Sequence, residues 1–304
     1  MQVVERKPRS PLSDTAQVRL LKQTAAAEIV RNWHKLLGVD VAEELAPVDR
    51  IALYECLESG LRFFTPPEAA GSARMYEQLE QFEWYYRDDK WEHRAALHDL
   101  RRCRRVLEVG CGRGAFVRRL SGLGIGAEGL ELNRKSALAA QAAGLSVRCA
   151  DLAEVLREGR RYDAVCSFQV LEHVADPRGF LAAMSGLLEA GGRLILSVPN
   201  SETFTRHAKL DLLNEPPHHM TQWSERSFAF LTRILPLELL HFRREPLAPY
   251  HVDWYLSVQA QRLALAEECA DRLLRNLLGR LLRIDALRRL IRGHTLYVCF
   301  QKPC

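Results

Sequence analysis

The fold of this chain is decided by residues 106–114, Val-Leu-Glu-Val-Gly-Cys-Gly-Arg-Gly. The apolar and β-branched first half of this stretch predicts a buried parallel strand. Glycines then stand at alternate positions, and a helical pattern begins near Ala115. Glycine is needed where a backbone turns sharply and approaches a ligand without a Cβ in the way. At the carboxyl end of a first strand in an open α/β sheet, the expected ligand is a nucleotide-like cofactor.

Three acidic residues accompany this loop. Glu108 precedes the glycines on the strand itself. Glu131 ends a second predicted strand over 126–131, and Asp151 follows a third over 146–149. A carboxylate at the first of these strand ends can accept hydrogen bonds from both ribose hydroxyls, and one at the second can accept from an adenine amino group. The order of the acids therefore indicates a cofactor that contains adenosine.

Two kinds of cofactor suit such a loop. Read loosely, Gly110, Gly112 and Ala115 match the dinucleotide fingerprint G-x-G-x-x-G/A, in which a pyrophosphate binds at a helix N-terminus. An acid behind the glycines, here Glu108, is unfavourable beside a pyrophosphate but compatible with the positive sulfonium and ammonium of S-adenosylmethionine. The acids therefore favour S-adenosylmethionine over a nicotinamide or flavin cofactor.

At these residues the chain resembles the class I S-adenosylmethionine-dependent methyltransferases. Their first motif, E-x-G-x-G-x-G, begins here at Glu108, and residues 162–174 match their fourth-strand motif. The resemblance covers about 105–200 without a gap, and it assigns the ribose acid to Glu131 and the adenine-side acid to Asp151. It implies a cofactor site made of Glu108, Gly110, Cys111, Gly112, Gly114, Glu131, Leu132, Asp151, Leu152, Phe168 and Gln169.

Strands and helices alternate along the middle of the chain. The predicted strands cover 105–109, 126–131, 146–149, 162–168 and 193–198, and the helices between them end at Gly122, Ala143 and Leu188. Alternation of this kind implies a parallel sheet with helices on both faces. Residues 237–244 and 295–301 add two strands, which the family arranges as an antiparallel pair at one edge. The expected fold is α/β: a Rossmann-like, seven-stranded, mostly parallel sheet with an N-terminal helical extension and a helical insertion before the last strand.

Residues 1–71 are expected to form an N-terminal segment, and 72–304 the methyltransferase domain. Apolar spacing predicts one helix over 14–37, followed by a strand over 51–56. The next residues resemble half of a zinc knuckle, C-x-x-C-G-L, but Ser59 replaces the second cysteine after Cys56. Because a structural zinc site needs about four ligands and no other C-x-x-C exists, no metal ion is expected.

The composition narrows the function classes. The chain has 304 residues, a net charge of +5, 47% hydrophobic and 27% charged residues, which is ordinary for a soluble globular protein. It has no apolar run long enough to span a membrane and no secretory signal. The eight cysteines form no C-x-x-C pair, so reduced thiols and a cytoplasmic location are expected. The charge is too small to indicate a nucleic-acid partner.

Two segments flank the predicted sheet. Residues 72–100 are predicted to form a helical region, and methyltransferases of this class often fold such a region over the cofactor as a lid. Its aromatic residues could line the pocket or pack the helix on the sheet, and the neighbouring Lys90, Glu92 and His93 favour a pocket wall. The aromatic residues of this region are Tyr76, Phe82, Trp84, Tyr85, Tyr86 and Trp91. A long insertion over 250–293 ends in an arginine-studded amphipathic helix. Three interpretations stay open for that helix: packing on the same chain, a homodimer contact, or peripheral contact with an anionic membrane.

Methyl transfer from a sulfonium is an in-line displacement, so the protein mainly aligns the acceptor and excludes water. An acceptor hydroxyl or acidic C–H also needs a base. His218 and His219 follow two prolines in a loop beyond the fifth strand and are the expected catalytic residues. Glu172 and His173, in an L-E-H-V stretch similar to that of ubiquinone-pathway O-methyltransferases, are the alternative.

Taken together, the sequence predicts an S-adenosylmethionine-dependent methyltransferase that acts on an oxygen or carbon of a small-molecule or lipid-like acceptor. The other interpretation is a non-catalytic protein that binds the cofactor and uses the arginine-rich helix as a partner surface. The intact acids Glu108, Glu131 and Asp151 indicate retained cofactor binding in both cases. Only turnover separates the two.

Overall fold

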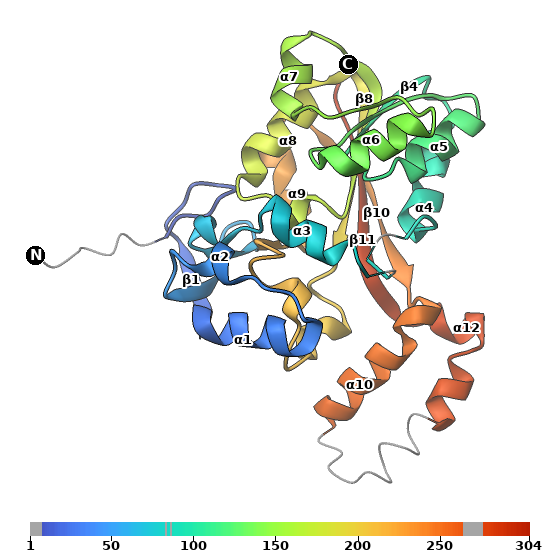
Figure 1. Ribbon diagram of the computed structural model, residues 1–304. Coiled ribbons are helices and arrows are strands. Elements are labelled where there is room, and N and C mark those ends of the chain that lie inside the picture. Colours follow the sequence, from blue (N-terminus) through green and yellow to red (C-terminus); the bar gives the residue numbers. More distant parts are fainter. Residues whose placement is uncertain (1–7, 83, 86, 264–275) are drawn as a thin grey trace, which may run out of the picture.

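The computed structural model describes residues 8–82, 84–85, 87–263 and 276–304, and a seven-stranded sheet runs through its centre (Figure 1). In spatial order the strands are β10 (Glu238–Pro246), β11 (Arg292–Gln301), β8 (Leu188–Pro199), β7 (Tyr162–Phe168), β4 (Arg105–Val109), β5 (Gly126–Leu130) and β6 (Val147–Arg148). The five strands from β8 to β6 are parallel, whereas β11 is antiparallel to both of its neighbours. The predicted sheet and its antiparallel edge pair are confirmed.

Helices cover both faces of this sheet. They are α4 (Trp91–Asp99), α5 (Ala115–Gly122) and α6 (Arg134–Ala142) on one face, and α7 (Leu152–Arg157), α8 (Pro177–Gly186) and α9 (Glu225–Phe230) on the other. Neighbouring strand residues point to opposite faces, so Val106 packs with Phe116 of α5 while Leu107 packs with Leu181 of α8. This alternation explains why the strands are apolar throughout instead of alternating with polar residues.

The end of α8 corrects one sequence expectation. The helix before the fifth strand is predicted to end at Leu188, but α8 ends at Gly186, and Leu188, Gly191 and Gly192 all lie within β8. Leu188 already pairs with Tyr162 of β7, and the register shifts before the next pair. Gly191 has a φ of +76°, which a glycine adopts without strain. The glycines therefore form an irregularity inside the strand.

A second sheet has four strands, in the order β1 (Val18–Ala25), β2 (Arg50–Cys56), β3 (Arg62–Thr65) and β9 (Thr221–Gln222). The single helix expected over 14–37 is therefore wrong in its first half, because only α1 (Ala26–Leu37) is helical. Strand β1 pairs antiparallel with β2, a distant partner that a local pattern does not reveal. Leu21 belongs to the apolar spacing that predicted the helix, yet it is 39% exposed on this edge strand.

Strand β9 joins the N-terminal segment to the loop that follows β8. Its residues pair with Arg62 and Phe63 of β3, and Asn200 at the end of β8 forms a bridge with Trp223. The chain between β8 and α9 is thus fixed to the four-stranded sheet through β9 and to the end of β8 through the bridge between Asn200 and Trp223. The short helical turns near this loop are η2 (Leu171–His173), η3 (Phe204–His207) and η4 (Leu212–Asn214).

The remaining described elements are short helices and turns outside the two sheets. They are α2 (Ala42–Leu45), α3 (Ala73–Leu79), α10 (Val252–Arg262), α12 (Asp285–Arg288), η1 (Pro67–Ala69), η5 (Leu231–Arg233) and η6 (Pro249–His251). In the insertion, Leu256 and Leu282 pack against Phe204 of η3. Packing on the same chain is therefore one role of its described part, while residues 264–275 of the arginine-rich stretch lie outside the described residues. No helix in the described chain is long and apolar enough to cross a membrane.

Candidate functional site

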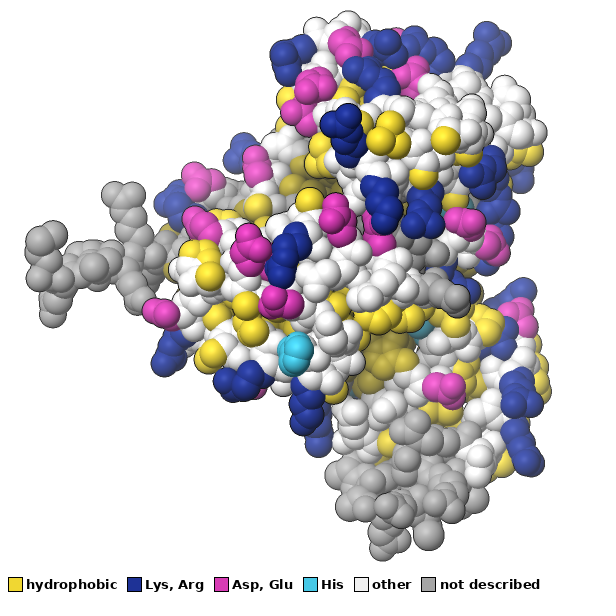
Figure 2. All heavy atoms as spheres, viewed as in Figure 1, with side chains coloured by type: hydrophobic (Ala, Val, Ile, Leu, Met, Phe, Trp, Pro, Cys, Tyr) yellow, Lys and Arg dark blue, Asp and Glu magenta, His cyan; other side chains and the backbone are white. Residues whose placement is uncertain are grey.

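A cavity of about 1380 Å³ opens at the carboxyl edge of the parallel strands. One wall follows the ends of β4, β5, β6 and β7, and the other comes from α1, α3, the loop after β8, α10 and the start of β11. Figure 2 shows a hollow floored by hydrophobic side chains between the N-terminal part and the α10 segment. Since drug-sized ligands fill pockets of about 300–1,000 Å³, this cavity has room for a cofactor and a second molecule.

The glycine loop after β4 brings bare backbone to the cavity. Gly110 and Gly112 line it. Gly110 has a φ of +76°, and a Cβ there would lie only 2.4 Å from Cγ2 of Val170. The backbone N–H of Gly110 donates to the carbonyl of Leu130 at 2.8 Å, which ties the loop to the end of β5. Only glycine fits this turn, as the sequence indicated.

Glu131 follows β5 and holds the loop in place. Its Oε2 accepts a hydrogen bond from the backbone N–H of Gly112, and its Oε1 accepts from that of Asn133, both at 2.8 Å. A carboxylate has about four lone-pair sites, so two remain for a ligand. Glu131 lines the cavity and is partly exposed. It can therefore support the loop and accept from a diol at the same time.

Asp151 stands at the next strand end. Its Oδ1 caps α7 by accepting from the backbone N–H of Glu154 at 2.7 Å, which leaves Oδ2 for the cavity. The neighbouring apolar residues Leu132 and Leu152 also line the cavity. Leu132 is 74% exposed, so it has apolar surface available to a flat ring. Acid and apolar groups thus alternate along this wall, as a nucleoside site requires.

Three predicted cofactor residues lie behind the cavity wall. Glu108, Cys111 and Gly114 are not among its lining residues. Glu108 is buried within β4, its Oε2 has no hydrogen-bond partner among the described residues, and burial raises the pKa of its carboxyl to about 8. Cys111 packs on Gly129, and Gly114 packs on Leu145. Their contribution is to the shape of the loop.

Phe168, the last residue of β7, and Gln169, which follows it, complete this wall. Phe168 packs against Phe116 and His93, which keeps His93 buried and away from the cavity. Gln169 has a φ of +57°, an uncommon conformation for a residue with a side chain. Its Nε2 donates to Oε1 of Glu92 at 3.3 Å. Strained residues of this kind gather at binding sites, and this one faces the cavity.

The opposite wall carries the predicted histidines. His218 and His219 are each 5% exposed and line the cavity together with His173 of η2. The rings of His218 and His219 stack at 4.5 Å, and His173 lies edge-on to both at 4.6 and 4.7 Å. The backbone N–H of Met220 donates to the carbonyl of Glu172 at 2.8 Å, which joins the two segments. The structure thus unites both of the alternatives that the sequence left open.

Burial keeps these imidazoles neutral. It lowers the pKa of His173 to about 4 and holds the pKa values of His218 and His219 well below the usual range of histidine. Desolvation is the main cause in each case, because a charged ring loses its hydration. Glu172 is also buried, and desolvation raises the pKa of its carboxyl to about 8. At neutral pH this wall therefore offers unprotonated ring nitrogens.

Aromatic residues from the predicted lid contact these histidines. The hydroxyl of Tyr85 lies 2.9 Å from Nε2 of His218, and that of Tyr76 lies 3.2 Å from Nδ1 of His173. Tyr76, Tyr85 and Trp84 line the cavity, whereas Phe82 packs in the N-terminal core and Trp91 packs on the main sheet. The region is thus both pocket wall and packing seam, and Tyr86 lies outside the described residues.

Sequence reasoning missed the far end of this wall. His251, Trp254 and His294 line the cavity, and Trp254 and His251 belong to the insertion. The ring of His294 lies 5.4 Å from that of His251. His294 directly precedes the predicted last strand, whose start must lie at the carboxyl edge because that strand runs antiparallel. That position could have identified His294 from the sequence. No sequence pattern predicts that α10 approaches the cavity.

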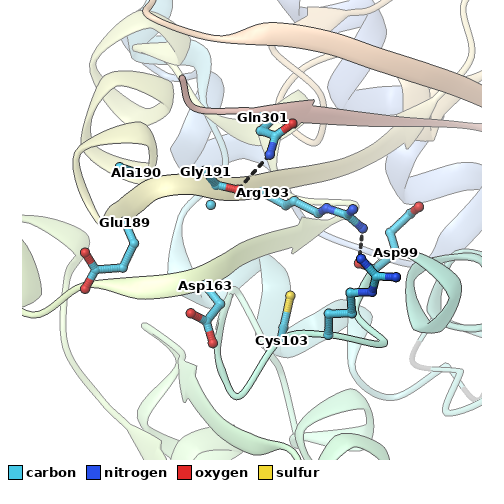
Figure 3. Close-up of a pocket in the computed structure, with 10 residues that line it drawn as sticks. Asp99, Cys103, Asp163, Glu189, Ala190, Gly191, Arg193 and Gln301 are labelled. Atoms are coloured by element: carbon cyan, nitrogen blue, oxygen red, sulfur yellow. Dashed lines mark hydrogen bonds between the residues drawn. The ribbon is translucent and has the colours of Figure 1, made fainter. Parts of the chain in front are cut away.

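A smaller pocket of about 220 Å³ lies at the opposite, amino edge of the sheet (Figure 3). Two of its charged side chains are already bound within the fold. Arg193 donates to the backbone carbonyl of Asp99, and Asp163 accepts from the backbone N–H groups of residues 104 and 105 at 2.6 and 2.9 Å. Ligands of open α/β sheets bind at the carboxyl edge. The large cavity is therefore the candidate site.

Comparisons with known proteins identify the family of this chain. The family described as methyltransferase domain matches residues 84–302, more than half of the chain. The ubiquinone biosynthesis O-methyltransferase of Parvibaculum lavamentivorans is 33% identical over 110 residues, which are 34% of this chain and 43% of that protein. The corresponding protein of Ralstonia nicotianae is 34% identical over 117 residues, 36% of this chain and 47% of that protein.

The chain thus spans less than half the length of the curated relatives it matches. Among solved structures, a SAM-dependent methyltransferase from Archaeoglobus fulgidus is 19% identical with a TM-score of 0.46, over 69% of this chain and 94% of that one.

Proposed function

Since the chain belongs to the methyltransferase domain family and uses S-adenosylmethionine as its cofactor, we propose that it methylates an oxygen or acidic carbon of a small, largely apolar acceptor. The observation that carries this proposal is one cavity with two chemically different walls. One wall presents the glycine loop and Glu131, and the other presents buried neutral imidazoles. The first suits the cofactor and the second suits a proton-bearing acceptor.

The residues of the first wall fit the cofactor. A Cβ at Gly110 would collide with Val170, so the loop leaves room only for a group that packs on bare backbone. Glu131 has two lone-pair sites beyond those used by the loop, and Oδ2 of Asp151 has no hydrogen-bond partner within the part of the chain that the structure describes. We assign the ribose hydroxyls to the former and the adenine edge to the latter. When bound, the cofactor supplies a methyl group that its sulfonium already makes electrophilic.

The second wall prepares the acceptor. Nδ1 of His219 donates to Oδ1 of Asn214 at 3.2 Å, so its Nε2 is the basic nitrogen. Among the described residues this Nε2 has no hydrogen-bond partner, whereas Nε2 of His218 accepts from the hydroxyl of Tyr85. Of the two predicted catalytic histidines, His219 is therefore placed to receive the proton of an acceptor, and His218 to orient it with Tyr85.

The cavity also limits the acceptor class. Its acceptor side includes Leu36, Leu210, Leu212 and Trp254, and most of its wall is apolar. A largely apolar molecule gains most from such a wall, while one hydroxyl or acidic C–H must reach the histidines. The similarity to ubiquinone biosynthesis O-methyltransferases supports a hydroxyl on an apolar molecule.

Transfer of a labelled methyl group tests the proposal. The purified chain would be incubated with methyl-labelled S-adenosylmethionine and a panel of phenols, hydroxyquinones and long-chain acids, with a polar sugar set as comparison. We expect label in an apolar hydroxylated acceptor and none in the sugars. Tight cofactor binding with no transfer to any acceptor, including those in a bacterial lipid extract, would favour the non-catalytic alternative instead.

A further inference from the structure

Helix α3 contacts both the wall that carries the histidines and the wall that carries the glycine loop. Tyr76 and Glu80 stand four residues apart at its C-terminal end, so their side chains lie on the same face of the helix. The hydroxyl of Tyr76 lies 3.2 Å from Nδ1 of His173, on the acceptor side of the cavity. Glu80 contacts the cofactor side. One face of a short helix therefore joins the two walls.

Glu80 reaches the cofactor side through one carboxylate oxygen. Its Oε1 accepts hydrogen bonds from Nδ2 of Asn133 at 3.0 Å and from Oγ of Ser136 at 3.2 Å. Asn133 caps α6 and lines the cavity, and its backbone N–H donates to Glu131, the residue assigned to the ribose. Glu80 itself is not among the lining residues. It therefore acts on the cofactor site through Asn133, as a positioning residue.

The carboxylate of Glu80 is buried, which makes these hydrogen bonds important. Its side chain is only 4% exposed, and Nζ of Lys135 lies 4.0 Å from Oε2. Among the described residues, Oε2 has no hydrogen-bond partner. A buried carboxylate is unfavourable unless donors surround it, and a helix N-terminus stabilises a negative charge. The start of α6 thus supplies the groups that hold Glu80 in place.

Apolar packing does not join α3 to α6. Met75 and Leu79 of α3 pack in the core of the N-terminal part, whereas Ala137 and Ala140 of α6 pack in the core on one face of the main sheet. Within the part of the chain that the structure describes, no hydrophobic cluster contains residues of both helices. The hydrogen bonds of Glu80 can therefore break and form again while both cores stay intact.

We propose that Glu80 is a clamp that holds α3 against the cofactor wall, so that the cofactor leaves only after Oε1 has released Asn133 and Ser136. Leu132, next to Asn133, lines the cavity and is 74% exposed, so this end of the cofactor wall is open to solvent beside the clamp. The contact of Tyr76 keeps the same helix on the acceptor wall. The inference rests on the cofactor placement in the proposed function and does not depend on the identity of the acceptor.

Release of S-adenosylhomocysteine, the demethylated cofactor, from the full chain tests this proposal. The chain would be loaded with the radiolabelled compound, mixed with an excess of unlabelled compound and sampled by rapid filtration. Glu80→Gln replaces the accepting carboxylate by a neutral amide. We expect the label to leave about tenfold faster or more, because hydrogen bonds to a charged group are lost. The association rate should not fall, since the residues that line the cavity are unchanged.

Two further variants separate the clamp from a general loss of stability. Glu77→Gln, at an exposed position of the same helix, is the matched control and should release the label like the unaltered chain. Asn133→Ser keeps a capping oxygen for α6 but removes the amide that donates to Glu80, so it should also release faster. In the double variant the increase should be smaller than the product of the two single effects, because both changes break the same contact.

Unchanged release in Glu80→Gln and Asn133→Ser, with both shown to be folded by thermal melts, would overturn the proposal. Slower association with unchanged release, or single effects that multiply in the double variant, would also overturn it. If the unaltered chain did not bind S-adenosylhomocysteine, both the clamp and the cofactor placement would fail. If it bound the compound and all variants released it at the same rate, only the clamp would fail.

Discussion

The two walls of the cavity are built from the sequence in different ways. The cofactor-side wall follows the ends of four parallel strands between residues 105 and 169, and each key residue directly follows its strand. The acceptor-side wall collects residues from Leu36 to Thr295, which come from α1, the lid region, the loop after β8, and the insertion. A local motif can encode the first wall, but only tertiary packing assembles the second. The cofactor wall is therefore the one that a family shares, and the acceptor wall is where individual chemistry resides.

The largest expected effect concerns the pH dependence of stability and the buried Glu108. Its carboxyl pKa is raised to about 8 in the folded chain, against 4.5 when unfolded. The folded state therefore holds a proton that the unfolded state releases, so this contribution to stability is present below pH 4.5 and is lost as pH rises to about 8. The separation corresponds to roughly 5 kcal/mol.

Glu108→Gln should remove this loss. Chemical denaturation at several pH values would show the variant gaining stability relative to the unaltered chain between pH 4.5 and 8. If the stability of the two proteins changed equally with pH across that range, the carboxyl of Glu108 would be hydrated in the folded chain. The strand end behind the glycine loop would then be open to water.

The next effect belongs to the acceptor wall. His219→Asn removes the basic Nε2, and turnover should fall by about 10²–10⁴-fold because the general base is lost. The cofactor dissociation constant should stay unchanged, because His219 belongs to the other wall. Steady-state rates and calorimetry on the same preparation check this split. Normal turnover in both His219→Asn and His218→Asn would move the chemistry to Glu172 or elsewhere.

Gly110→Ala tests the cofactor wall directly. The added Cβ would lie 2.4 Å from Cγ2 of Val170 in a backbone conformation with a φ of +76°. We expect a loss of about 1–3 kcal/mol in stability, cofactor binding or both. Gly144 also has a φ of +76°, but a Cβ added there would meet nothing within 4 Å. The variant Gly144→Ala therefore shows the effect of backbone strain without a collision. Equal effects in the two variants would show that Val170 yields and that the loop is not tightly fitted.

Tyr85→Phe should have the smallest effect. It removes the hydroxyl that donates to Nε2 of His218 and leaves the ring in the lid region. A single hydrogen bond contributes about 0.5–1.5 kcal/mol, so we expect a rise in the acceptor KM of about tenfold or less. A loss of turnover as large as that of His219→Asn would instead make Tyr85 a catalytic residue.

The contrast between the walls also explains what the sequence could predict. Residues 105–200 predict the five parallel strands because most of these strands alternate with helices, and the glycine loop marks the cofactor edge. The helix over 14–37 failed because β1 forms only through pairing with the distant β2. The histidines after β8 were identified by their place beyond the fifth strand. Their union with His173, and the contacts from Tyr85 and Trp254, depend on packing that no local pattern contains.

Calorimetric titration of the chain with S-adenosylmethionine or its demethylated product tests the central claim most directly. Glu131→Ala removes the carboxylate assigned to the ribose hydroxyls, and Glu154→Ala removes an exposed acid on α7 as a control. We predict binding by the unaltered chain and by the control, with Glu131→Ala weaker by roughly 1–3 kcal/mol, because hydrogen bonds to a charged group are lost. Equal affinity in all three proteins, with each shown to be folded, would contradict the placement of the cofactor at this edge of the sheet.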